Sequence, residues 1–203
     1  MSLDALPFNW FDLLIVIVLF VGVGHGRKQG ISEELMGTLQ WVAIVAGCAV
    51  VYRPLGNRIS SVSVFSLLSS YLMAYFATAL IIASGFAVLR KVLGGKLVGS
   101  DVFGRSEFYL GMIGGVVKFS CILIVGLALL NARAYNSVEI KADVTYQNDV
   151  YGSTYFPKLY SVQAQVFEHS LLGPWIKANL GCLLIDSTAP DDKKLKRKDA
   201  ALP

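Results

Sequence analysis

The sequence predicts an all-α integral membrane protein with four transmembrane helices and a C-terminal amphipathic helical region. Of its 203 residues, 55% are hydrophobic and only 16% are charged, whereas soluble domains carry about 25% charged residues. The mean hydropathy is +0.58. The apolar residues form four long runs with basic residues near their ends, which is typical of helices that cross a bilayer.

The first predicted helix covers about residues 7–24. At the helical rise it would measure about 27 Å, which is adequate for a bilayer core of ~30 Å. Pro7 suits a first helical turn, and Trp10 has the position of an interfacial aromatic residue. We expect Asp12 to cap or begin this helix near the interface, with a proton or cation site as the alternative. The N-terminus has no basic region or cleavage site, so we expect a retained span.

Gly22, Gly26 and Gly30 are spaced four residues apart at the end of this first run. Glycines at that spacing share one helical face and let a second helix approach closely in lipid. They follow an apolar helix and lack the spacing of a dinucleotide-binding motif. We therefore predict that they pack helices together.

The second predicted helix covers about residues 32–53. Ser32 is a suitable N-cap, and Glu34 would lie in the first turn, where the helix dipole favours acids. Pro54 would end the helix, and residues 54–63 would form a short polar connection.

The third predicted helix, about residues 64–89, is long enough to cross the bilayer with a tilt. Small and hydroxyl side chains recur along it at helical spacing. We interpret them as a packing stripe, with the wall of a polar pathway as the alternative. They are Ser66, Ser70, Ala74, Ala77 and Ser84.

The fourth predicted helix covers about residues 108–131. Gly111 and Gly115 give it a glycine face near its start. Lys118 would lie about 15 Å from that start, at a depth where a charge is costly and indicates function by default. We expect Lys118 to pair with Glu34, either as a structural ion pair or as part of a transport path.

After Asn131 the chain becomes more polar. Residues 132–190 are predicted to form an extracytoplasmic region, with an irregular linker over 132–157. The apolar residues of 158–172 follow helical spacing, which indicates an amphipathic helix on the membrane or against a partner. A second short segment follows over 175–185. Residues 191–203 are predicted to be a disordered basic tail, because they are too polar to pack.

Basic residues near the spans set the expected orientation. The loops after the first and third predicted helices hold six basic residues: Arg27, Lys28, Arg90, Lys91, Lys96 and Arg105. The opposite side of the membrane holds three: Arg53, Arg58 and Arg133. Because cytoplasmic loops are enriched in Lys and Arg, both termini are predicted to lie outside the cytoplasm. A fifth crossing over residues 166–185 is the alternative, which Glu168 and Lys177 would make costly.

No arrangement of residues indicates a catalytic, cofactor-binding or metal site. The histidines, His25 and His169, lie in different regions, and no catalytic set or phosphate loop accompanies them. Cys48, Cys121 and Cys182 are far apart, so we expect free thiols. The net charge of +4 has no nucleic-acid-binding motif beside it. We expect a non-enzymatic protein without a cofactor that does not bind nucleic acid.

Three motifs occur in an order that is informative when taken together. They are Phe11-Asp12, Gly26-x3-Gly30-x3-Glu34-Leu35, and Ser106-Glu107 followed by Gly111-x3-Gly115 and Lys118. In order and spacing, over about residues 8–131, they resemble the colicin V production protein family of bacterial inner-membrane proteins. Phe108 stands where that family usually has Arg, and Phe119 where it often has Gly.

The resemblance implies a multi-pass protein of the bacterial inner (plasma) membrane that is needed for colicin V production or export. In some relatives the four-span unit is joined to an extracytoplasmic serine protease, which agrees with a C-terminus outside. We therefore expect a non-enzymatic envelope scaffold or accessory factor for bacteriocin production or export. Its expected partners are the lipid bilayer and either further copies of itself or an envelope protein. The alternative is a small channel or transporter that uses Lys118 with Glu34.

Overall fold

The structure, a computed structural model, describes residues 9–97, 106–151 and 158–189. In these ranges the chain is all-helical, as predicted, apart from one isolated β-bridge between Arg133 and Thr188. The elements are α1 (Trp10–Val62), α2 (Leu67–Leu97), α3 (Glu107–Asn131), α4 (Ser137–Tyr151), α5 (Leu159–Phe167), α6 (Gly173–Asn179) and the 3-10 helix η3 (Gly181–Leu183). Pro7 and the predicted tail 191–203 lie outside the described residues.

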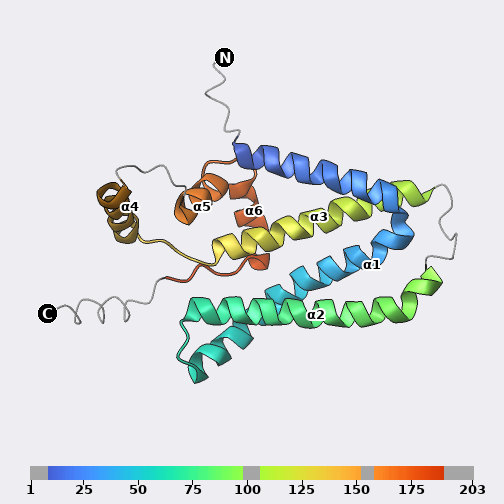
Figure 1. Ribbon diagram of the computed structural model, residues 1–203, viewed down its shortest axis with the longest axis horizontal. Helices are drawn as coiled ribbons and strands as arrows, with labels where there is room; N and C mark the ends of the chain where they lie inside the picture. The colour runs from blue at the N-terminus through green and yellow to red at the C-terminus, as the bar shows by residue number, and fades with distance from the viewer. Residues whose placement is uncertain (1–8, 98–105, 152–157, 190–203) are drawn as a thin grey trace, which may run out of the picture.

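α1 contains a sharp kink at Gly30. This residue has a φ of 70° and a ψ of 170°, a backbone conformation that favours glycine because it has no Cβ. Figure 1 shows that the chain folds back there, so α1 consists of a first limb (residues 10–29) and a second limb (residues 31–62). The first predicted helix therefore ended too early, and Ser32 lies inside the helix instead of capping it.

The second limb of α1 continues beyond Pro54, where the prediction ended it. Packing against α2 explains why the helix persists over residues predicted to be a connection. Tyr52 and Tyr71 meet edge to face with ring centroids 5.5 Å apart, and the Tyr71 hydroxyl donates a hydrogen bond of 2.9 Å to the Asn57 side chain. Gly56 lies against the Tyr71 ring, so the two helices approach closely.

In the part of the chain that the structure describes, three helices are long and apolar enough to cross a membrane. They are α1, α2 over Leu67–Val92, and α3, with mean hydropathies of 1.8, 2.1 and 2.4 in their most apolar windows. α2 starts later than the predicted residue 64 and continues past residue 89 to Leu97. Its continuation is physically reasonable because Arg90 and Lys91 can extend their charged ends toward water while the backbone stays helical.

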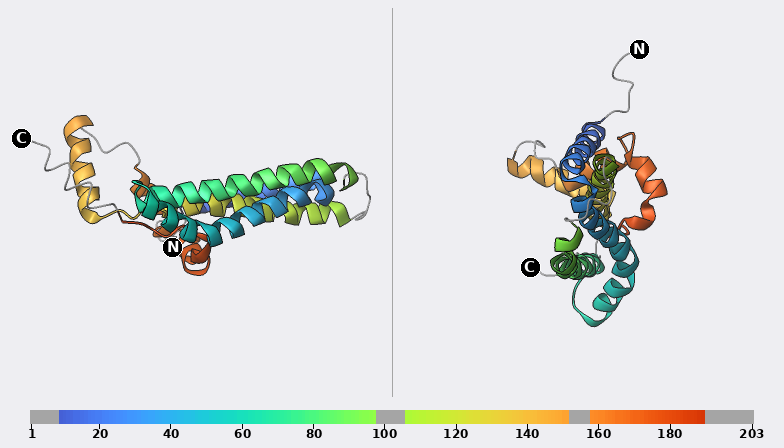
Figure 2. Two further views of the ribbon diagram at one scale, coloured as in Figure 1. Left: turned by 90° about the horizontal axis from the view of Figure 1, so that it is seen from below. Right: turned by 90° about the vertical axis from the view of Figure 1, so that its right-hand side faces the viewer.

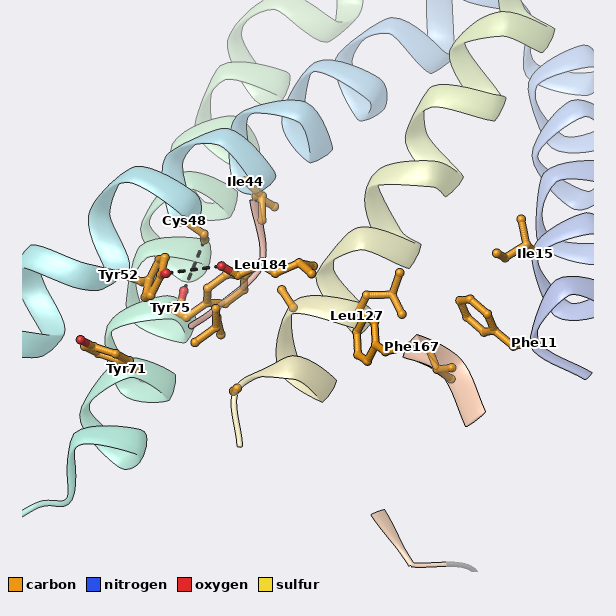
Figure 3. Close-up of a cluster of buried hydrophobic side chains, with 14 residues drawn as sticks. Phe11, Ile15, Ile44, Cys48, Tyr52, Tyr71, Tyr75, Leu127, Phe167 and Leu184 are labelled. Carbon is orange, nitrogen blue, oxygen red and sulfur yellow. Dashed lines mark hydrogen bonds between the residues drawn. The ribbon is translucent and has the colours of Figure 1, made fainter. Parts of the chain in front are cut away.

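α3 lies alongside α1, and α2 lies alongside the second limb of α1 (Figures 1 and 2). Figure 3 shows the buried hydrophobic cluster, which includes residues from the start of α1, the end of α3 and the C-terminal segment. It joins residues from α1, α2, α3 and the C-terminal segment, among them Phe11, Tyr52, Tyr75, Leu127, Phe167 and Leu184. In it the Cys48 thiol donates to the Tyr75 carbonyl over 3.5 Å.

The region after α3 is more regular than predicted. α4 is a 15-residue helix inside the predicted irregular linker. Glu139 lies in its first turn, where an acid is favoured by the helix dipole, and pairs with Arg133. Figure 2 shows α4 standing away from the bundle.

The predicted amphipathic helix over residues 158–172 ends early, and Gly173-Pro174 starts a new one. α5 has nine residues and α6 has seven. A helix needs about 20 residues to cross a bilayer. Neither of these elements is therefore long enough to supply the alternative fifth crossing by itself.

Candidate functional site

The first limb of α1 and α3 meet along four glycines, which we call the glycine seam: Gly22, Gly26, Gly111 and Gly115. A Cβ added at Gly22 would lie 2.9 Å from the Gly115 carbonyl oxygen, and one at Gly26 would overlap the Gly111 carbonyl. The reverse additions on α3 would overlap the carbonyls of Gly26 and Gly22. The two backbones therefore approach so closely that only glycine fits between them.

The glycine seam continues into the kink and toward the buried charges. A Cβ at Gly30 would lie 2.9 Å from the Glu107 side chain, and one at Gly114 would lie 3.5 Å from Cγ of Glu34. Thr38 of the second limb donates a 3.1 Å hydrogen bond to the Gly114 carbonyl. Near the Gly30 kink, α3 therefore contacts both limbs of α1.

Lys118 and Glu34 form an ion pair beside the glycine seam, in which Glu34 is buried and Lys118 is half-buried. Lys118 Nζ lies 3.1 Å from Glu34 Oε1 and donates to Oε2 over 3.4 Å. The Glu34 side chain is 1% exposed and that of Lys118 is 18% exposed. The pairing expected from the sequence is therefore present, and it joins α3 to the second limb of α1.

His25 also contacts this pair, which the sequence did not indicate. Its Nε2 lies 3.9 Å from Glu34 Oε2, and its ring meets that of Phe119 edge to face at 5.9 Å. The contact depends on the fold-back at Gly30, so residue spacing alone could not reveal it. A carboxylate, an ammonium and an imidazole in contact can hold the helices together or pass a proton.

Asp12 lies at the other end of the bundle, in the first turn of α1, where Asn9 is the N-cap and Asp12 is the third helical residue of the capping box. Its Oδ2 accepts a 3.0 Å hydrogen bond from the Asn9 backbone N–H, within a capping box. The same carboxylate accepts 3.1 and 3.2 Å hydrogen bonds from the backbone N–H groups of Leu171 and Leu172. Asp12, which is 3% exposed, therefore also fastens the C-terminal segment to the start of α1.

We call residues 159–189 the C-terminal cap. It is attached to the second limb and to α3 as well. The Tyr52 hydroxyl donates to the Leu184 carbonyl over 3.3 Å, and the Asn131 side chain donates to the Ile185 carbonyl over 2.9 Å. Leu184 and Ile185 are fully buried. The cap is thus part of the packed structure at this end of the bundle.

The apolar face predicted for residues 158–172 packs against the chain itself. Val166 and Phe167 are buried in the same cluster as Phe11, which corrects the expectation that this face rests on the membrane or a partner. Leu171 and Trp175 lie on the outside of the cap, each 57% exposed. The cap therefore has a buried face toward the bundle and an exposed apolar face.

Replacing Asp12 with alanine should loosen the cap while the bundle stays folded. Hydrogen bonds to a charged group contribute about 1.5–3 kcal/mol, so we expect amide exchange at Leu171 and Leu172 to accelerate more than tenfold. Hydrogen–deuterium exchange measures this. Asp186→Ala is the control, because its pair with Arg53 is about half exposed and contributes little. Equal exchange in both variants would show that Asp12 does not fasten the cap.

Three long apolar helices, a glycine seam and a buried ion pair define a helical membrane protein. The family model described as colicin V production protein matches residues 11–178. The chain therefore belongs to the colicin V production protein family, and this membership indicates a membrane protein involved in toxin production. No curated protein and no solved structure matches the chain.

Proposed function

We propose that this protein is a non-enzymatic scaffold of the bacterial inner membrane that supports toxin production or export. The observation that carries the proposal is the C-terminal cap. It is held by Asp12, Tyr52 and Asn131 at one end of the bundle, and it keeps Trp175 exposed. A preformed exposed surface is what an accessory protein needs in order to hold a partner, which is either a second copy or another envelope protein.

The proposal includes four crossings: the two limbs of α1, α2 and α3. The first limb would measure about 30 Å, enough for the bilayer core. Both ends of this four-crossing unit, the start of α1 and the end of α3, lie at the cap end (Figure 1). This arrangement suits a chain that crosses an even number of times. The basic residues Arg27, Lys28, Arg90 and Lys91 favour the cytoplasm for the kink end, so the cap and both termini are extracytoplasmic.

Changing the exposed face of the cap should reduce toxin release while the amount of protein stays the same. We expect Leu171→Ser/Trp175→Ala to lower release several-fold in cells that carry it as their sole copy, because it removes partner contacts without touching the core. Leu80→Ser/Ile81→Ala is the matched control for two exposed apolar residues in α2, which are 66% and 72% exposed. Unchanged release with the cap variant would contradict the proposal.

A second candidate function is a small channel or transporter. The buried Glu34–Lys118 pair with His25 beside it favours this candidate. In it, the charged cluster lines the path of a proton or cation. Ion flux in vesicles that contain the purified protein, abolished by Lys118→Met, would support the channel. Absence of flux with the unaltered chain would support the scaffold.

A further inference from the structure

An open cavity of about 740 Å³ lies between the first limb of α1 and the start of α3. Its lining comes from both helices: Gly24, Arg27, Lys28, Phe108, Tyr109 and Met112. This volume is within the usual range for ligand sites, about 300–1,000 Å³. The cavity is near the kink end of the bundle and is distinct from the buried ion pair and from the C-terminal cap.

Gly24 contributes to this space by having no side chain. A Cβ added at Gly24 would meet no atom within 4 Å, in contrast to the overlaps at Gly22 and Gly26 on the same limb. The fold therefore does not require glycine at position 24 for close helix packing. A larger side chain there would take up part of the cavity, and its Cβ would not press on the neighbouring helix.

The lining combines two cations with apolar and aromatic side chains. Arg27 and Lys28 are exposed, and among the described residues neither lies within ion-pair distance of a carboxylate. Phe108 and Tyr109 are 58% and 70% exposed. Within the described ranges, the cavity thus presents two cations without an ion-pair partner beside an apolar and aromatic wall, which suits a ligand with an anionic group on an apolar body.

We propose that this cavity is a binding site for an anionic phospholipid. The phosphate would contact Arg27 and Lys28, and an acyl chain would lie against Phe108 and Met112. Basic pockets between transmembrane helices on the cytoplasmic side recognise anionic headgroups in this way. The inference requires that α1 and α3 lie in a membrane, and it is independent of the scaffold proposal.

Native mass spectrometry of the full chain, with added phosphatidylglycerol or phosphatidylcholine, tests this site. We expect the chain to retain phosphatidylglycerol preferentially. Arg27→Gln/Lys28→Gln should weaken that binding roughly thirty-fold, because each basic residue near a lipid surface contributes about 1 kcal/mol. Gly24→Leu should also weaken it, without any change in charge, because its side chain takes up space in the cavity that the lipid would occupy.

Two control variants separate the site from general effects. Arg90→Gln/Lys91→Gln removes two exposed charges from α2, and Gly85→Leu adds a side chain at another helical glycine whose Cβ would meet nothing within 4 Å. Both should bind phosphatidylglycerol like the unaltered chain. Equal weakening by these controls, or no weakening by Gly24→Leu, would overturn the proposal. Displacement of the lipid by inorganic phosphate alone would assign the site to a free anion and would also overturn it.

Discussion

Replacing Gly26 with alanine should separate α3 from the first limb of α1. The added methyl group would overlap the Gly111 carbonyl, and a backbone atom cannot move aside unless its helix moves. Overpacking of this kind costs about 3 kcal/mol at the upper end of the usual range. It outweighs the gain of up to about 1 kcal/mol that alanine brings over glycine inside a helix. We expect a lower Tm in detergent, measured by circular dichroism.

Gly24→Ala is the matched control, since it adds the same methyl group two residues away in open space. It should leave the Tm unchanged or raise it slightly, because only the helix-propensity gain remains. Gly115→Ala should behave like Gly26→Ala, because its Cβ would overlap the Gly22 carbonyl. Equal Tm values for Gly24→Ala and Gly26→Ala would show that close packing at the glycine seam does not hold these helices together.

Replacing Lys118 with methionine should lower the stability of the protein by a similar amount, because it removes one charge of the ion pair with Glu34. Glu34 is 1% exposed, so the variant leaves a buried carboxylate without its ammonium partner. Breaking a buried ion pair from one side costs about 3–5 kcal/mol. We expect a clear loss of membrane-inserted protein, measured by quantitative immunoblotting of membrane fractions, together with a lower Tm.

The double variant Lys118→Met/Glu34→Gln separates pairing from other effects of losing Lys118. It removes both charges, so most of the lost stability should return. Glu33→Gln is the control for the acid, since Glu33 is the exposed neighbour of Glu34 and should be nearly neutral. If Lys118→Met changes neither protein level nor toxin release, the ion pair contributes to neither stability nor function.

The helical class could be predicted because long apolar runs depend only on local sequence. The ion pair joins residues 84 positions apart, and it could be expected because the predicted topology puts Glu34 and Lys118 near the same membrane face. The end of the second limb could not be predicted in this way. Pro54 is a sound signal for a helix end, and contacts between Tyr52, Tyr71 and Asn57 outweigh it.

The contacts of the C-terminal cap with the bundle could not be predicted from residue spacing either. Local sequence places Asp12 at the start of the first helix, and there it completes the capping box with Asn9. Its bonds to Leu171 and Leu172 join residues 159 and 160 positions apart, which no local pattern encodes. Likewise, the apolar residues Val166 and Phe167 indicate a buried face without saying what buries it.

The sidedness of Cys182 tests the central claim most directly, because this thiol is exposed on the cap while Cys48 and Cys121 are buried. A membrane-impermeant maleimide added to spheroplasts should label Cys182 without lysis. A cysteine introduced as Lys91→Cys in a Cys182→Ser background should be labelled only after lysis. That result would place the cap outside and the kink end in the cytoplasm. Labelling of Cys182 only after lysis would contradict the proposed topology and, with it, an extracytoplasmic surface for an envelope partner.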